Sequence, residues 1–192
     1  MKKWREKRGY RYATVFFILF LILAAMTVQP MMTNVLGEEI VIQTKPFDPR
    51  DLFRGDYVQL DYAINEISLE KLGDEMIKLK GEEPYASFEG LRKEKLYVVL
   101  KKTGKLYGVD QVTLKKPKTG IFLKAKYSYP LWEDRSKEQN VKVKGIRVTY
   151  TLDKYFVPEN TGKALEEKAR KGELFAKIKV YKGYGLLKEI IE

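Results

Sequence analysis

The chain has 192 residues, a net charge of +11 and 44% hydrophobic residues, a composition that predicts one folded domain rather than a disordered or collagen-like chain. It contains neither Cys nor His, which excludes disulfide scaffolds, Cys nucleophiles, His-based triads, zinc sites of the Cys/His type and anchoring through a lipid-modified Cys. We therefore expect no metal site and no cofactor.

The first element is an apolar segment that follows a basic arm. Residues 13–28 read ATVFFILFLILAAMTV, and no charge occurs between residues 12 and 37. A membrane-spanning helix needs about 20 apolar residues, so the sequence predicts a transmembrane anchor at 13–35. Six basic residues in the arm at 1–12 place this arm in the cytoplasm by the positive-inside rule. We expect Pro30 to kink or end the helix near the outer interface.

A cleaved signal peptide is the alternative interpretation of this segment, since a basic region before an apolar region is common to both. Signal peptides have apolar regions of about 7–15 residues, and no clear small-x-small cleavage site follows here. We therefore predict an uncleaved single-pass protein of the cytoplasmic membrane, with residues 38–192 outside. Nucleic acid is then the least suited partner for the moderately basic domain, which could instead attract acidic lipid or an anionic wall polymer.

Short alternating segments separated by turn residues dominate residues 38–192. We expect strands at 38–45, 57–64, 95–102, 106–114, 120–127, 141–152, 173–182 and 185–191. Leu69, Leu72, Met76 and Leu79 recur at helical spacing and predict an amphipathic helix at 68–80, and a second short helix is expected at 162–171. The predicted fold class is α+β, mainly β, in which a transmembrane helix precedes one antiparallel sheet or a small barrel-like domain with one or two short helices.

The segment 46–62, PFDPRDLFRGDYVQLDY, carries most of the residues that we predict as functional. Two prolines, a glycine and five charges at 46–56 predict a structured loop that leads into a strand. Its arginines and aspartates can pair, because a guanidinium fits a carboxylate, and they either lock the strand entry or form a recognition surface. The candidate binding residues are Arg50, Asp51, Arg54, Asp56, Tyr57, Tyr62 and Glu159.

Within this segment, Gly55, Asp56, Tyr57, Leu60 and Tyr62 match the pattern GDYxxLxY. The chain therefore resembles the GDYXXLXY family of bacterial membrane-anchored proteins, and the segment YFVPENTGKALE at 155–166 is similar to the second block of that family. The resemblance implies a multi-pass membrane protein as a partner. It implies no biochemical activity and assigns no catalytic residue.

These features favour a non-enzymatic, membrane-anchored extracytoplasmic domain that binds a membrane-protein or envelope partner. The alternative is an envelope hydrolase with paired carboxylates, for which the candidates are Asp48, Asp51, Asp56, Asp61 and Glu159. A type I signal peptidase is disfavoured, because no Ser precedes Ser68. Converging carboxylates in a concave site would favour the enzyme, whereas salt-paired charges under a flat surface would favour the binding domain.

Aromatic residues gather around Pro130, where Tyr127, Tyr129, Leu131 and Trp132 lie close in sequence. Such a cluster either docks a sugar or a protein partner, or packs at the edge of the core. We expect packing at the core edge.

Overall fold

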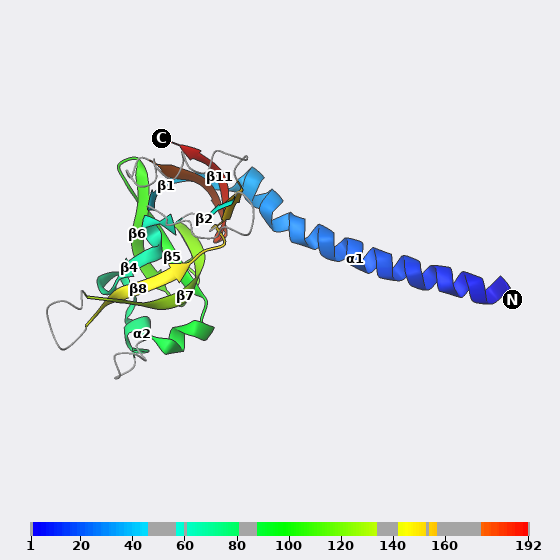
Figure 1. The fold of residues 1–192 in the computed structure, drawn as a ribbon, viewed down its shortest axis with the longest axis horizontal. Helices are drawn as coiled ribbons and strands as arrows, with labels where there is room; N and C mark the ends of the chain where they lie inside the picture. Colours follow the sequence, from blue (N-terminus) through cyan, green and yellow to red (C-terminus); the bar gives the residue numbers. More distant parts are fainter. Residues whose placement is uncertain are drawn as a thin grey trace.

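The computed structural model describes residues 2–45, 57–59, 61–80, 88–133, 142–152, 154–156 and 174–191, and Figure 1 shows a long helix that projects from a β domain. The elements in chain order are α1 (Lys2–Leu36), β1 (Glu38–Lys45), β2 (Tyr57–Gln59), β3 (Asp61–Tyr62), η1 (Ala63–Asn65), β4 (Glu66–Ser68), η2 (Leu69–Lys71), α2 (Asp74–Ile77), η3 (Glu89–Lys93), β5 (Leu96–Thr103), β6 (Leu106–Thr113), β7 (Ile121–Trp132), β8 (Val143–Thr149), β9 (Lys154–Phe156), β10 (Phe175–Tyr181) and β11 (Tyr184–Ile191). The predicted mainly β fold with an N-terminal apolar helix is confirmed. The helix predicted at 162–171 lies outside the described residues.

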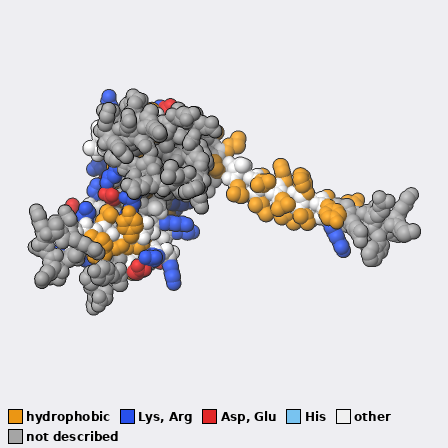
Figure 2. All heavy atoms as spheres, in the orientation of Figure 1, with side chains coloured by type: hydrophobic (Ala, Val, Ile, Leu, Met, Phe, Trp, Pro, Cys, Tyr) orange, Lys and Arg blue, Asp and Glu red, His pale blue; other side chains and the backbone are white. Residues whose placement is uncertain are grey.

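Helix α1 is long and apolar enough from Tyr10 to Leu36 to cross a membrane, and the apolar 18-residue window within this stretch is not buried in the domain. Figure 2 shows hydrophobic side chains along it, and Phe16 is 73% exposed. The helix continues for six residues beyond Pro30, so the expectation that Pro30 could end it is wrong. Proline is tolerated inside apolar spanning helices, because the turns on either side keep their own backbone hydrogen bonds.

Two antiparallel sheets form most of the domain. The four-stranded sheet has the order β11-β10-β1-β3 and curves as half a barrel, and the five-stranded sheet has the order β4-β8-β7-β5-β6. Just after β4, Leu72 bridges to Val112 of β6, and the Gly73 N–H donates to the Val112 carbonyl at 2.9 Å. Because β4 and β6 are the two edges of the five-stranded sheet, this contact nearly closes it into a barrel.

The helix predicted at 68–80 is wrong. Its place is taken by η2, the bridging residue Leu72 and the single turn α2. Leu72 and Met76 are buried as their spacing predicted, but Leu79 is 42% exposed. The extended backbone at residues 72 and 73 pairs with β6, and a helix cannot continue through residues that make sheet hydrogen bonds.

One hydrophobic core is shared by both sheets. Ile40 and Ile178 come from the four-stranded sheet and Leu96 and Ile146 from the five-stranded sheet, and each is at most 1% exposed. Burying a side chain of this size contributes about 1.5–3 kcal/mol relative to leaving it in water. The shared core therefore holds the two sheets together at the place where side chains of β1, β3, β4 and β8 form the charged cluster described next.

Candidate functional site

Four charged residues lie together beside the two strand ends that flank the segment 46–60. Lys45 ends β1 and is directly opposite Asp61, which begins β3. The guanidinium of Arg147 on β8 contacts Asp61 Oδ1 at 2.8 Å and Glu66 Oε1 at 3.3 Å. Lys45 Nζ contacts the other oxygen of Glu66, Oε2, at 2.6 Å. We call Lys45, Asp61, Glu66 and Arg147 the β1–β3 charge cluster.

Half-burial makes the ion pairs of this cluster stronger than pairs in open water. The side chains of Arg147 and Asp61 are 21% and 13% exposed. The hydrogen bond from Lys45, together with the positive charges nearby, lowers the pKa of Glu66 despite partial burial. Desolvation opposes the charged form of Arg147, but the hydrogen bond and charge of Asp61 outweigh it and raise the pKa of the guanidinium. Glu66 and Arg147 are therefore both charged at neutral pH.

The geometry of the cluster is that of ion pairs that hold neighbouring strands together, and it differs from that of a catalytic carboxylate pair. A carboxylate pair for acid–base chemistry needs one group that holds a proton, whereas Asp61 and Glu66 share one guanidinium. Asp61 is the one carboxylate of the proposed hydrolase set that the structure describes, and it is salt-paired. Among the described residues, no group of three or more Asp or Glu side chains could hold a metal ion.

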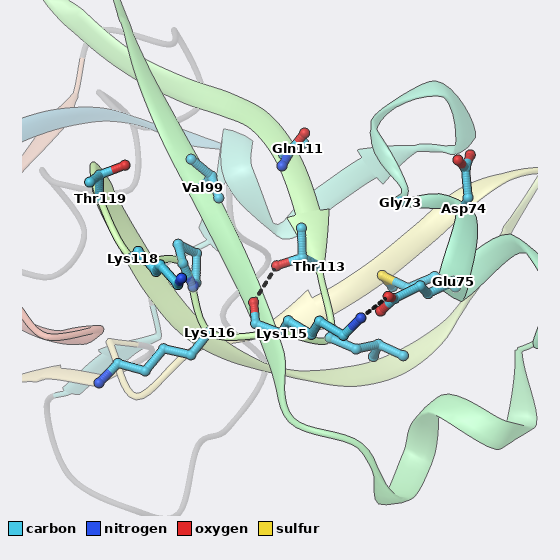
Figure 3. A pocket seen from close by; sticks show the side chains of 13 residues that line it. Gly73, Asp74, Glu75, Val99, Gln111, Thr113, Lys115, Lys116, Lys118 and Thr119 are labelled. Carbon is cyan, nitrogen blue, oxygen red and sulfur yellow. Dashed lines mark hydrogen bonds and ion pairs between the residues drawn. The ribbon is translucent and has the colours of Figure 1, made fainter.

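A separate cavity of about 570 Å³ lies between α2 and the connection from β6 to β7 (Figure 3). On its wall, Lys115 Nζ contacts Glu75 Oε1 at 2.6 Å, and the Thr113 hydroxyl donates to the Lys115 carbonyl at 2.7 Å. Lys116 and Lys118 also line it. The volume suits a small ligand, but the Lys115 side chain is 85% exposed, so the charges here are solvated. The sequence analysis did not predict this cavity.

Most of the predicted binding surface cannot be placed. The residues that lie outside the described part of the chain are Arg50, Asp51, Arg54, Asp56 and Glu159. Tyr57 is placed by its backbone in β2, and Tyr62 is placed with its side chain.

A model of the family described as GDYXXLXY protein matches residues 19–190. The chain belongs to the GDYXXLXY family. Comparisons with curated proteins and with solved structures found no match. The family match covers the second half of α1 and almost all of the β domain, so part of the helix and the domain are both included in the family model.

The structure brings the two GDYXXLXY blocks together. Strand β2 carries Tyr57 of the motif, and it pairs antiparallel with β9 of the second block, with Tyr57 opposite Phe156 and Gln59 opposite Lys154. The two blocks are about 100 residues apart in sequence, yet they form one two-stranded ladder. The first residue of β2 and the last residue of β9 are therefore directly opposite each other.

The last tyrosine of the GDYXXLXY motif lies in the core. Tyr62 is 0% exposed, and its hydroxyl donates to the Leu152 carbonyl at 2.8 Å. In return, the Tyr150 hydroxyl donates to the Ile64 carbonyl at 2.7 Å. These two bonds fasten the end of the motif to the end of β8, so in this structure Tyr62 supports the domain from within.

The aromatic residues around Pro130 are divided between the core and the surface. Tyr127 is 7% exposed, and Trp132 packs against the core cluster. Tyr129 is 48% exposed, and its ring lies 5.8 Å from the guanidinium carbon of Arg147. A cation over an aromatic face is attractive, so Tyr129 covers one side of the β1–β3 charge cluster.

Sequence reasoning missed Lys45, Glu66 and Arg147. Asp61 was considered only as one carboxylate among several. Its partner Arg147 lies 86 positions later, and no local pattern links two residues at that separation.

Proposed function

We propose that this chain is a single-pass protein of the cytoplasmic membrane whose extracytoplasmic domain binds another membrane protein or an envelope component. In this proposal residues 13–35 span the bilayer, the arm at 1–12 is cytoplasmic and residues 38–192 are outside. The observation that carries it is the exposed apolar surface of α1, which is joined to the domain through the single residue Gly37. An apolar helix of this length is unfavourable in water and is stabilised by lipid.

The junction between α1 and the domain supports an uncleaved anchor over a cleaved signal peptide. Thr33 is 0% exposed, and the Asn34 carbonyl accepts a hydrogen bond from Lys179 Nζ at 2.7 Å. The end of the helix is thus part of the folded domain. Cleavage near residues 35–37 would separate the helix end from the domain and remove these contacts.

The β1–β3 charge cluster supports a binding role over a hydrolytic one. Its carboxylates are neutralised by Arg147 and Lys45 rather than left to converge on a substrate. The binding surface in this proposal is formed by Arg50, Asp51, Arg54, Asp56, Tyr57 and Glu159. It is supported by the β2–β9 ladder, in which Tyr57 is opposite Phe156.

The membrane topology is testable because the natural chain has no Cys. Single substitutions Lys126→Cys, at an exposed position on β7, and Lys3→Cys, in the arm, each introduce one reactive thiol. With a membrane-impermeant maleimide on intact cells, we expect Lys126→Cys to be labelled and Lys3→Cys to be labelled only after lysis. The reverse pattern would refute the proposed orientation, and a shortened mature protein without α1 would refute the anchor.

The binding surface is tested by crosslinking and pull-down from native membranes. We expect Arg54→Ala combined with Asp56→Ala to lose the partner that the wild type captures. The matched control is Glu70→Ala combined with Lys80→Ala, which also removes one charge of each sign, at exposed positions elsewhere. A folded Arg54/Asp56 double variant that keeps every partner would show that this surface is not the binding site.

A further inference from the structure

The last turn of α1 is bound by two lysines from the C-terminal strands. Lys179 Nζ on β10 donates to the Asn34 carbonyl at 2.7 Å, and Lys188 Nζ on β11 donates to Asn34 Oδ1 at 2.8 Å. The last four carbonyls of a helix lack partners within the helix and carry partial negative charge, which cations stabilise. Helix α1 has no basic residue in its own last turn, so β10 and β11 supply the cations.

A β-bulge lies at the residue that makes one of these bonds. In the ladder between β10 and β11, Lys177 is opposite Glu189 but Ile178 is opposite Leu187, so Lys188 is the extra residue. A bulge interrupts the alternation of side chains along a strand and redirects the inserted side chain. Here Lys188 reaches Asn34, which precedes it by 154 positions.

The position of the two amines relative to α1 is fixed by close packing. A Cβ at Gly37 would lie 2.3 Å from the Thr33 carbonyl oxygen and 3.1 Å from Lys179 Cβ. Gly37 also donates its N–H to the Thr33 carbonyl at 2.9 Å. Only glycine allows this approach, so the end of the helix lies directly against β10 at the junction.

The length of α1 gives the depth of the two amines, if α1 spans the bilayer as proposed above. Arg11 is the last charge before the apolar segment, and Asn34 follows it by 23 residues, or about 35 Å at ~1.5 Å per residue. The hydrocarbon core is about 30 Å thick, and the bilayer with its headgroups is about 40–45 Å thick. Asn34 and the amines bound to it therefore lie in the phosphate layer of the outer leaflet.

The nearby carboxylates leave the two amines available. Glu39 is opposite Lys179 in the ladder, but its carboxylate contacts Lys177 Nζ at 3.7 Å, and Lys177 also pairs with Glu189. Among the described residues, no carboxylate pairs with Lys179 or Lys188. An ammonium has three N–H donors and each lysine gives one of them to Asn34, so two donors on each remain.

We propose that Lys179 and Lys188 bind the phosphate of an anionic phospholipid in the outer leaflet, with Asn34 holding both amines at the required depth. The inference rests on the proposed membrane anchor and adds a ligand to it. A lipid bound here ties the C-terminal strands to the headgroups and fixes the side on which the domain lies against the bilayer.

The test is native mass spectrometry of the full chain in micelles that contain phosphatidylglycerol. We compare the wild type with Lys179→Gln combined with Lys188→Gln, which keeps a donor for Asn34 but removes both charges. Two lysines near anionic headgroups contribute about 1 kcal/mol each, so the double variant should bind phosphatidylglycerol about 30-fold more weakly. The matched control, Lys116→Gln combined with Lys118→Gln, changes two exposed lysines that line the cavity beside α2 (Figure 3), and should stay within about twofold of the wild type.

Three further arms decide the outcome. Lys188→Gln alone alters an exposed side chain, so it keeps the test valid if the double variant unfolds, and it should weaken binding about fivefold. Excess inorganic phosphate should not displace the lipid, and complete displacement would overturn the proposal in favour of a soluble anion site. If a folded Lys188→Gln protein binds the lipid as well as the wild type does, this inference is overturned. The proposed anchor is unaffected if Lys126→Cys is still labelled from outside. Failure of the labelling itself would instead overturn the proposed orientation, on which this inference rests.

Discussion

At the scale of single residues, two tyrosine hydroxyls donate hydrogen bonds to backbone carbonyls at the end of the GDYXXLXY motif. The hydroxyl of Tyr62 donates to the carbonyl of Leu152, and the hydroxyl of Tyr150 donates to the carbonyl of Ile64. All four residues are buried, so both carbonyls would otherwise be cut off from water. A buried acceptor without a partner costs more than the bond itself contributes, which gives the final tyrosine of the motif a stabilising role.

We predict that Tyr62→Phe lowers the free energy of unfolding by about 1–2 kcal/mol, because it removes the hydroxyl and leaves the ring volume nearly unchanged. Urea denaturation of the full chain in detergent, followed by circular dichroism, measures the loss. The control is Tyr129→Phe, whose ring is 48% exposed and which should change stability by less than about 0.5 kcal/mol. Equal losses in both variants would contradict the role given to the Leu152 bond.

The β1–β3 charge cluster predicts a dependence of stability on acid. The pKa of Glu66 is lowered first by the hydrogen bond from Lys45, so its ion pairs stabilise the fold fully above the ordinary value of about 4.5 and are lost as the pH falls through the lowered pKa. Glu66→Gln should therefore be less stable than the wild type at pH 7, and the difference should shrink as the pH falls below about 4.5 and through the lowered pKa. Denaturation midpoints across this range measure it, with the exposed Glu70→Gln as control. A constant difference between Glu66→Gln and wild type would contradict the prediction.

At the scale of elements, the alternation of apolar and polar residues predicted most strands, whereas the helical spacing of apolar residues at 68–80 predicted a helix that the structure does not have. The strand predicted at 38–45 is found as β1, and the one at 106–114 as β6. The helix at 68–80 was wrong because Leu72 bridges to Val112, a partner 40 positions away that local spacing does not reveal. The same reason hid Arg147 as the partner of Asp61. The surface at 50–56 and Glu159 stays a prediction, since the structure does not describe those residues.

The β10–β11 turn offers a test of how the two sheets are joined. Gly183 has φ +84°, and a Cβ there would lie 2.6 Å from the Phe122 ring on β7. Gly104, in the β5–β6 turn, has φ +64° and nothing within 4 Å. We predict that Gly104→Ala costs about 1–2 kcal/mol from backbone strain alone, whereas Gly183→Ala costs about 1–3 kcal/mol more from overpacking. Similar urea midpoints for the two variants would show that the turn can move away from β7.

At the scale of the whole molecule, α1 and the β domain form one body. The last turn of the helix packs on β10 and β11, and the junction residue Gly37 is itself in close contact. If α1 spans the bilayer as proposed, a tilt of the helix therefore tilts the domain with it. A flexible linker, by contrast, lets a domain reorient freely about its anchor.

We predict that inserting Gly-Ser-Gly-Ser after Gly37 frees the domain from the helix. A fluorescent label at Lys126→Cys in liposomes should show a high residual anisotropy in the parent protein and a much lower one after the insertion. The same insertion at the β5–β6 turn is the control and should keep the parent value, because the helix packs mainly on β10 and β11 and the insertion leaves the Gly37 junction unchanged. Equal anisotropy in the parent protein and the linker variant would contradict rigid coupling.

Because a single residue joins α1 to the domain, the number of residues in α1 determines the rotation of the domain about the helix axis. Each residue of an α-helix advances the chain by about 100° around its axis and about 1.5 Å along it. Adding or deleting one residue between Arg11 and Thr33 would therefore rotate the whole domain by more than a quarter turn about the helix axis. It would move the domain along that axis by only about 1.5 Å. In the proposed topology, a partner protein in the same membrane would then face a different set of strands, even though no residue of the domain had changed.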